Sequence, residues 1–363
     1  MKLLIVEDES SQIEMYIDGI DSFNKKNEIE IQPIVVRSVD DAKQELLKSN
    51  YDCAIIDLKL VSGSDDLDGL ELVVSIKDKL RFPIFIVSGS ISQIDQIDES
   101  AFLKKRLRDD DFQKVLKEAV KIYSTGITKI LGKEGVVDKY LSDIFWKHIS
   151  SSIDLWIDDS TRDETQKEKS LLRYAILHMQ EYIDEEIEKY HPNEFYIVKP
   201  IKKNIFTGDI IKHGEDRYVV LTPSCDIVLR EGGTRNAEKI LFCKIKSLDS
   251  DVVKNFSSLN KDTLKSNDNR KRLNGFIENK NQRYHFIPRG SLITEGLIDF
   301  QDKITISTGD VESHISNNRM KRIATISTPF LKDIISRYSN YYARQGSPDF
   351  DSDEVYNLIF EGK

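Results

Sequence analysis

The sequence predicts an α/β domain at the N-terminus, followed by a helical connector and a β-rich domain. Three observations support this division. Short apolar runs alternate with amphipathic stretches over the first third, long helical patterns follow, and short strand-like runs between Gly, Asp and Asn residues occupy the rest. We place the domains at 1–122, 123–193 and 194–363. The length of 363 residues is enough for at least two hydrophobic cores.

The N-terminal domain is expected to contain a parallel sheet that is buried on both faces. Its predicted strands are continuous apolar runs, as burial on both faces requires. Regular alternation of these runs with helical patterns indicates βαβ units. The expected strands are 2–6, 29–36, 53–60, 83–87 and 101–103, and the expected helices are 11–23, 39–47, 70–80 and 112–123.

Helical periodicity dominates the connector, at 136–156 and 170–190, and the polar stretch 158–169 is a loop or the solvated start of a helix. The apolar stripe from Leu171 to Ile183 indicates either packing within the connector or a dimer interface. The strands expected downstream predict a compact barrel or sandwich, closed by a helix over 328–342 that begins at Thr328-Pro329. These strands are 195–198, 209–211, 217–221, 239–245, 284–287 and 303–306.

Composition excludes several classes of protein. The net charge of -9 argues against a chain covered by nucleic acid, although it allows a local basic patch. No apolar run is long enough for a membrane span, and the acidic Glu7 and Asp8 do not fit a secretory signal. Three cysteines are too few for a disulfide framework and fit a reducing cytoplasm, so we expect a cytoplasmic protein.

Three acidic residues lie where the predicted strands end. Glu7 and Asp8 follow the first strand, and Asp57 ends the apolar stretch of the third. In the flavodoxin-like strand order 2-1-3-4-5, the first and third strands are neighbours, so the three carboxylates converge at the carboxyl edge of the sheet. Like charges at such a distance repel one another, and a hard divalent cation relieves the repulsion. The cluster therefore predicts a Mg²⁺ site that leaves positions open for phosphate.

Two further residues complete this predicted site. Ser88 ends the fourth strand, where its hydroxyl can donate to a phosphoryl oxygen, and Lys105 follows the fifth strand and supplies a positive charge. Phosphoryl transfer needs mainly positioning and charge neutralisation from the protein. The metal, the lysine and the hydroxyl together offer both.

Residues 1 to about 122 resemble a response-regulator receiver domain in five segments: VEDE, IIDLKL, LDGLEL, IVSGS and FLKKRL. The resemblance implies that Asp57 accepts a phosphoryl group from a histidine kinase, and that the domain promotes its own phosphotransfer and dephosphorylation. It also implies that Glu7, Asp8, Asp57 and the backbone carbonyl of Lys59 hold Mg²⁺. The pair that rearranges on phosphorylation would be Ser88 and Phe102.

The chain departs from the receiver pattern near the predicted site. Ten residues separate Asp57 from Asp68, more than is usual, and this insert carries Ser62, Ser64, Asp65 and Asp66. The stretch from Ser88 to Lys105 is instead short, which predicts a stunted fourth helix. Arg106 replaces the usual proline, and Lys104 is a second candidate for the lysine role. These changes argue against the dimer switch that is usual in the family. They do not argue against the phosphoryl site.

In the C-terminal domain, FTGDIIKHGEDRYVVLTPSCDI is similar to the opening of the SH3-like barrel of MazF/PemK growth-inhibitor toxins. An RNA- or nucleotide-cleaving toxin gated by the receiver is therefore the alternative function. Cys225 lacks an identifiable histidine partner for catalysis and is expected to be a buried thiol. Zinc binding through Cys225 and Cys243 is disfavoured because no paired ligand spacing accompanies them.

A basic segment, 261–290, interleaves Lys and Arg with aromatic residues, a combination that can track a phosphate backbone. The candidate contacts are Arg270, Lys271, Arg272 and Arg283. The alternative is a basic loop that leads into a core strand.

The ending FLKDIISRYSNYYARQGSPDF, with RYHFIP and LIDF before it, is similar to C-terminal domains that accompany receivers in bacterial anti-phage two-component systems. This resemblance implies a histidine kinase and a second response regulator or effector as partners. The chain would then accept phosphoryl groups and so moderate signal flow to another regulator, rather than act as a transcription factor. A homodimer is a further possible assembly.

Overall fold

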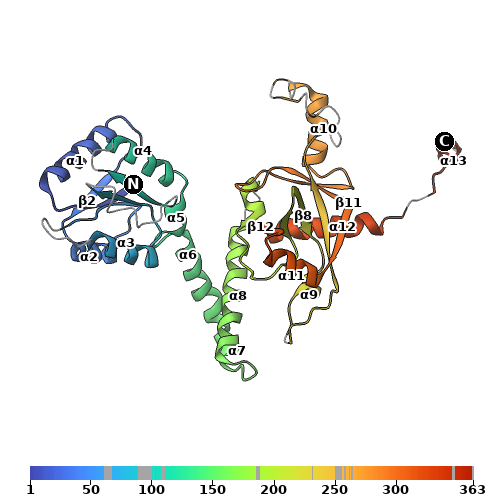
Figure 1. Ribbon diagram of the computed structural model, residues 1–363, viewed down its shortest axis with the longest axis horizontal. Helices are drawn as coiled ribbons and strands as arrows, with labels where there is room; N and C mark the ends of the chain where they lie inside the picture. The colour runs from blue at the N-terminus through green and yellow to red at the C-terminus, as the bar shows by residue number, and fades with distance from the viewer. Residues whose placement is uncertain are drawn as a thin grey trace. The chain divides into compact units, whose positions relative to one another are not determined.

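The computed structural model describes residues 1–60, 68–88, 100, 102–107, 111–184, 189–230, 232–249, 256, 259–260, 262, 265–345 and 348–361. The chain divides into two compact units, Met1–Ile187 and Glu188–Lys363 (Figure 1). The segment expected to be a connector, 123–193, lies mostly within the first unit, and its last six residues belong to the second. Each unit is described by itself below.

The first unit is built on a five-stranded parallel sheet in the order β2-β1-β3-β4-β5, which is the predicted flavodoxin-like order. The alternation of strand and helix is also as predicted. The strands are β1 (Lys2–Val6), β2 (Gln32–Val36), β3 (Cys53–Asp57), β4 (Ile84–Ser88) and β5 (Leu103–Leu107). The helices that accompany the sheet are α1 (Ser10–Asn24), α2 (Val39–Lys48), α3 (Asp68–Lys79) and α4 (Phe112–Tyr123).

The sheet is buried on both faces, which explains its continuous apolar strands. In β1, Leu4 and Val6 join the core beneath α2 and α3, whereas Leu3 and Ile5 join the core beneath α1 and α4. Figure 1 shows the two pairs of helices on opposite sides of the sheet. Side chains alternate between the faces of a strand, so every residue of β1 after Lys2 is buried.

The prediction for the fifth strand was wrong in position. We expected 101–103, but β5 runs from Leu103 to Leu107 and contains the charged run 104–106. This strand follows β4 at the end of the strand order and is the edge of the described sheet, where charged side chains are accommodated. Lys104 and Arg106 both form ion pairs with Glu118 of α4. The predicted stunted helix and most of the predicted insert lie outside the described residues.

The rest of the first unit is helical: α5 (Ile127–Leu131), then α6 (Val136–Asp143), the π-helix η2 (Ile144–Ile149), the 3₁₀ turn η3 (Ser150–Ser152), α7 (Ile153–Ile157) and α8 (Glu164–Ile183). Helix α8 begins six residues before the predicted residue 170. Asp163 starts it with a capping box, in which its carboxylate accepts from the Gln166 amide and its own amide donates to the Gln166 side chain. The second half of the polar stretch 158–169 is therefore the start of this helix, and the first half is a loop.

The second unit contains a seven-stranded antiparallel sheet in the order β10-β11-β9-β8-β7-β12-β6. The strands are β6 (Tyr196–Val198), β7 (Asp209–His213), β8 (Asp216–Val220), β9 (Lys239–Lys246), β10 (Tyr284–Ile287), β11 (Gly296–Ser307) and β12 (Met320–Ile326). The sheet curls, and at one end the Tyr196 hydroxyl donates to the Pro288 carbonyl at 2.6 Å. It nevertheless remains open between β6 and β10, so the expected barrel is corrected to a half-barrel.

Sequence patterns missed β12 and the first half of β11. β12 reads MKRIATI, which is too basic at its start to resemble a core strand, and the register of β11 shifts between Ile298 and Lys303. A bulge of this kind disrupts the alternation on which strand prediction depends. The helices are η4 (Pro192–Phe195), α9 (Ser224–Ile227), α10 (Asn267–Ile277), α11 (Thr308–Ser316), α12 (Thr328–Ala343) and α13 (Ser352–Phe360). Helix α12 begins at Thr328-Pro329, as predicted.

Two buried carboxylates stabilise the second unit. Asp209 accepts from the Arg322 guanidinium at 2.8 Å and from the Thr325 hydroxyl at 2.5 Å. Asp299 accepts two hydrogen bonds from the Arg283 guanidinium and forms an ion pair with Lys246. Buried charges persist in proteins when they are paired and hydrogen-bonded in this way. In the described part of the chain, no helix has the length and apolar character needed to cross a bilayer.

Candidate functional site

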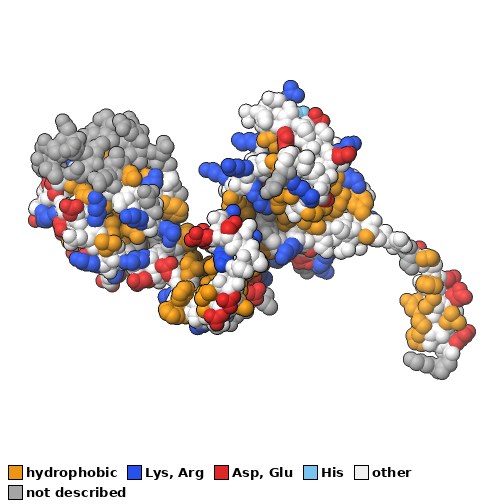
Figure 2. Space-filling view, turned by 90° about the horizontal axis from the view of Figure 1, so that it is seen from below, with side chains coloured by type: hydrophobic (Ala, Val, Ile, Leu, Met, Phe, Trp, Pro, Cys, Tyr) orange, Lys and Arg blue, Asp and Glu red, His pale blue; other side chains and the backbone are white. Residues whose placement is uncertain are grey.

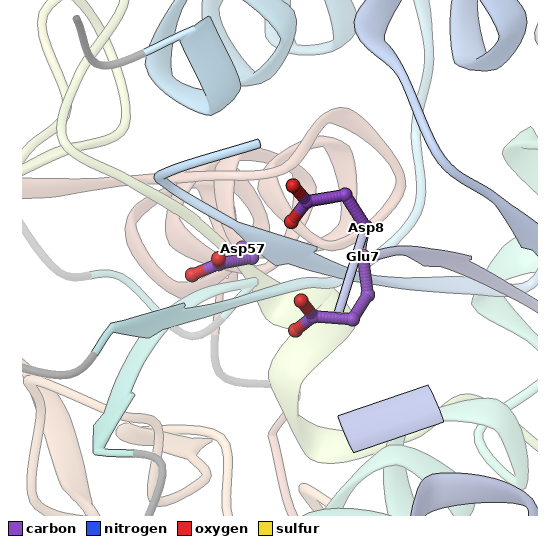
Figure 3. Close-up of side chains that lie close together, drawn as sticks. All are labelled: Glu7, Asp8 and Asp57. Atoms are coloured by element: carbon purple, nitrogen blue, oxygen red, sulfur yellow. The ribbon is translucent and has the colours of Figure 1, made fainter. Parts of the chain in front are cut away.

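Three carboxylates meet at the carboxyl edge of the parallel sheet (Figure 3). One oxygen from each of Glu7, Asp8 and Asp57 lies within 4.8 Å of the others. Glu7 and Asp57 are buried, with 1% and 2% of their surfaces exposed, and Asp8 is partly exposed. The convergence predicted from the sequence is therefore present in the structure.

The sheet register explains this convergence. β1 and β3 are adjacent and parallel, and Val6 pairs with Ile56, so Glu7 and Asp57 each follow a paired residue at the same level. Parallel strands end at the same edge, which brings residues fifty positions apart in the sequence into contact range. Three carboxylates offer only hard oxygen ligands in a small volume, and this donor set suits Mg²⁺. The residues present thus fit the metal that the sequence predicted.

The sequence did not identify Arg37 as part of this site. This residue directly follows β2, the other neighbour of β1 in the sheet. Its guanidinium donates to the Asp8 carbonyl at 3.0 Å and to the Ser10 hydroxyl at 3.2 Å, and so fixes the loop that carries Asp8. Its place at the end of a strand next to β1 is a signal that could have revealed it.

Gly69 packs directly against the backbone of the predicted phospho-acceptor. A Cβ atom at this position would lie 2.1 Å from the Asp57 carbonyl oxygen, and the Gly69 amide donates to the Leu58 carbonyl at 3.2 Å. Only glycine allows this approach of α3 to the end of β3. The sequence singled out Asp68-Gly69 as part of a motif, and the structure shows its physical reason.

The remaining predicted residues lie on β4 and β5 or beside them. Ser88 is the last residue of β4, as required, and its side chain is outside the described part. Lys105 was expected after the fifth strand, but it lies inside β5 and pairs in register with Ile86. Val87 of β4 pairs with Asp57 on one side and with Arg106 of β5 on the other. Lys105 therefore lies one residue short of the position in β5 that is level with Asp57.

Phe102 immediately precedes β5 and is 46% exposed. Lys59 lies two residues beyond the end of β3. Lys59 is thus on the carboxyl side of the sheet, with the acidic cluster, whereas Phe102 precedes the amino end of β5, on the opposite edge of the parallel sheet. Their predicted roles, a switch residue and a carbonyl ligand, remain predictions.

The predicted basic patch of the second unit is divided in the structure. Arg270, Lys271 and Arg272 are exposed on α10, whereas Arg283 is held by the buried Asp299. Burial raises the pKa of Asp299, but hydrogen bonds from Arg283 and Lys246 outweigh it and lower the pKa to about 2. Arg283 therefore has a structural ion-pair partner rather than an open guanidinium.

The two cysteines of the second unit have opposite environments. Cys225 is exposed at α9, so the expectation of a buried thiol was wrong for it. It lies in a four-residue helix at the surface rather than in a core strand. Cys243 is buried in β9, and burial raises its pKa to about 12. Among the described residues, neither belongs to a group of three or more side chains that could hold a metal.

The N-terminal part of the chain is similar to solved receiver domains. A CheY-like receiver domain from Methylobacillus flagellatus is 22% identical, with 33% of this chain and 96% of that chain covered and a TM-score of 0.26. The response regulator TrrA from Thermotoga maritima, solved with Mg²⁺ and BeF, is 17% identical over 33% and 97%, with a TM-score of 0.27.

A two-component transcriptional regulator from Clostridium phytofermentans is 19% identical over 34% of this chain and 95% of that chain, with a TM-score of 0.29. No protein-family model matches the chain. No curated protein matches it either. The likeness concerns the fold of about the first 120 residues.

Proposed function

We propose that the chain is a response-regulator-like protein that accepts a phosphoryl group on Asp57 from a histidine kinase. The observation that carries this proposal is the convergence of Glu7, Asp8 and Asp57 at the carboxyl edge of a parallel sheet in the order 2-1-3-4-5. Ligands of open parallel sheets bind at this edge. Buried carboxylates that repel one another are otherwise a cost to the fold, so a site that binds a cation explains their presence.

In the proposed reaction, a carboxylate oxygen of Asp57 attacks the phosphorus of a phosphohistidine. The P–N bond breaks as the P–O bond forms, the histidine nitrogen takes up a proton, and the product is an acyl phosphate. Bound Mg²⁺ would supply positive charge to the phosphoryl oxygens. Glu7, Asp8, Asp57 and the Lys59 carbonyl would hold it, while the Ser88 hydroxyl and Lys105 would bind and orient the phosphoryl group. Ser88 and Phe102 then rearrange.

The test is transfer of label to the full chain from a ³²P-labelled histidine kinase or from a labelled small acyl phosphate, with and without Mg²⁺. We expect acid-stable but base-labile label on the wild type, and none on Asp57→Asn or in the presence of excess EDTA. Asp18→Asn is the matched control, because Asp18 is exposed on α1. Label that persists on Asp57→Asn contradicts the proposal.

We further propose that the chain acts in bacterial anti-phage signalling as a phosphate-accepting component. The support is the resemblance of its final segments to domains that accompany receivers in such systems. A kinase and a separate regulator are then its partners. In a mixture of the three proteins, the chain should slow phosphorylation of the regulator, and Asp57→Asn should remove this effect. Equal rates with both forms contradict the buffering role.

A further inference from the structure

The helical part of the first unit forms an antiparallel hairpin with one internal seam. The segment α6–α7 packs on α8 through pairs of aromatic rings: Tyr140 with Tyr182, His148 with His178 and Trp156 with Tyr174. The His148 imidazole also lies 3.0 Å from the Tyr182 hydroxyl. Between residues 136 and 184, all of which are described, only Ile144 is buried. The hairpin therefore has a seam but no core of its own.

Beside the seam, each of the two helical segments carries a stripe of apolar residues. Almost every seam residue is followed in the sequence by an apolar residue, as Tyr140 is by Leu141 and Tyr182 is by Ile183. On α8 these residues have the 4-3-4 spacing that is typical of helices that associate. The stripe consists of Leu141, Phe145, Ile149, Ile153 and Ile157 on α6–α7, and Leu172, Ile176, Met179 and Ile183 on α8.

Both stripes lie on the same side of the hairpin. One residue further along a helix is a rotation of about 100° in a fixed sense. Because the two segments run in opposite directions, the same step from the shared seam turns both stripes toward one face. We call this the stripe face. Most of its side chains are exposed, with 53% for Phe145, 61% for Leu172 and 57% for Ile176, and Figure 2 shows apolar side chains on the surface of the hairpin.

Charges border the stripe face in a complementary pattern. Asp138 and Asp154 are exposed along the outer flank of α6–α7, and Lys169 and Arg173 are exposed along the outer flank of α8. Asp154 lies at about the level of Arg173, because Trp156 contacts Tyr174 across the seam. One edge of the face is therefore acidic, and the other is basic along the first half of α8, while the exposed Asp184, three helical turns after Arg173, ends this second edge.

We propose that the stripe face binds the stripe face of a second copy of this chain, so that two hairpins form a four-helix bundle. A two-fold axis parallel to the helices places α8 of one copy on α6–α7 of the other, and so sets Arg173 against Asp154. A two-fold axis across the helices would set the acidic edges against each other. A four-helix bundle gives the hairpin the core that it lacks alone. This proposal does not depend on phosphoryl transfer.

The first test is the mass of the full chain in solution, measured by light scattering from about 1 to 100 μM. We expect the wild type to reach twice its chain mass of 41.9 kDa. Ile176→Glu buries a charge against an apolar partner and should weaken the dimer by at least about 100-fold. Leu177→Glu is the matched control. Leu177 is 65% exposed and precedes a seam residue, so it is turned about 100° from Ile176, toward the other face of the hairpin.

A second variant tests the orientation without changing the apolar stripe. Arg173→Glu should weaken the dimer by about 5-fold, and addition of Asp154→Arg should restore it. An unchanged circular dichroism spectrum in the far ultraviolet shows that each variant keeps its helices; tryptophan emission is unsuitable, because Trp146 contacts Phe145 of the stripe and would respond to dimerisation itself. A wild-type monomer at 100 μM overturns the proposal. Dissociation by Leu177→Glu but not by Ile176→Glu also overturns it, because the interface would then be the opposite face.

Discussion

Removal of one negative charge from the acidic cluster should stabilise the protein when Mg²⁺ is absent. Two unit charges 4.8 Å apart, the largest separation in the cluster, repel by about 3.5 kcal/mol at an effective dielectric constant of 20. Asp57 has two such neighbours, and water screens the partly exposed Asp8. We therefore expect Asp57→Asn to raise the free energy of unfolding by about 1–3 kcal/mol, or about 3–8 °C in Tm.

The assay is calorimetry of the full chain in EDTA and across a Mg²⁺ titration. Mg²⁺ should stabilise the wild type by about 2.7 kcal/mol when its concentration reaches 100 times the dissociation constant. Asp57→Asn removes one of the ligands, so its gain from Mg²⁺ should be much smaller. The order of the two Tm values should therefore reverse as Mg²⁺ is added. Asp18→Asn, an exposed change on α1, should follow the wild type throughout.

Two results would refute this reasoning. In EDTA, an Asp57→Asn protein with the same or a lower Tm than the wild type would show that the carboxylates do not repel as the geometry requires. An equal rise of both Tm values with Mg²⁺ would show that the cation binds elsewhere.

Three further predictions concern residues outside the carboxylate cluster. Arg37→Ala should lower the Mg²⁺ affinity about 10-fold in a calorimetric titration, because the loop that carries Asp8 loses its hydrogen bonds from the guanidinium. Burial lowers the pKa of His285 from 6.5 to about 3, so only the unfolded chain gains its proton as the pH falls below 6.5. The second unit should lose about 2 kcal/mol between pH 7.5 and 5, and His285→Gln should flatten this loss. Arg283→Ala leaves the buried Asp299 with one cation fewer and should destabilise the second unit by about 2–3 kcal/mol in denaturant.

Each of these predictions has a contradicting outcome. An unchanged Mg²⁺ titration curve would show that Arg37 does not position the loop. A His285→Gln protein with the same acid limb as the wild type would assign that limb to other groups. The nearest acid, Asp333, is 3.7 Å away and well exposed, so solvent screens its attraction for a charged imidazole. Arg270→Ala, an exposed change on α10, is the control for Arg283→Ala, and equal stabilities would contradict the structural role of Arg283.

The sequence predicted most of the first unit because its buried parallel strands must be continuous apolar runs. Its failures there are at the edge of the sheet. β5 contains three consecutive cations and does not resemble a strand, because its charges reach Glu118 instead of a core. In the second unit, β12 and half of β11 were missed for related reasons: a basic start in one and a shifted register in the other.

By itself, the sequence determined the order of strands and helices in the first unit and the three carboxylates that share its edge. This was possible because burial on two faces and the parallel register leave few alternatives. Only the tertiary structure showed that Arg37 supports Asp8, that Gly69 packs on the acceptor backbone and that Arg283 is engaged by Asp299. It also showed that two apolar stripes share one face of the hairpin. These contacts join residues that are distant in the sequence, and local patterns do not record which distant segments become neighbours.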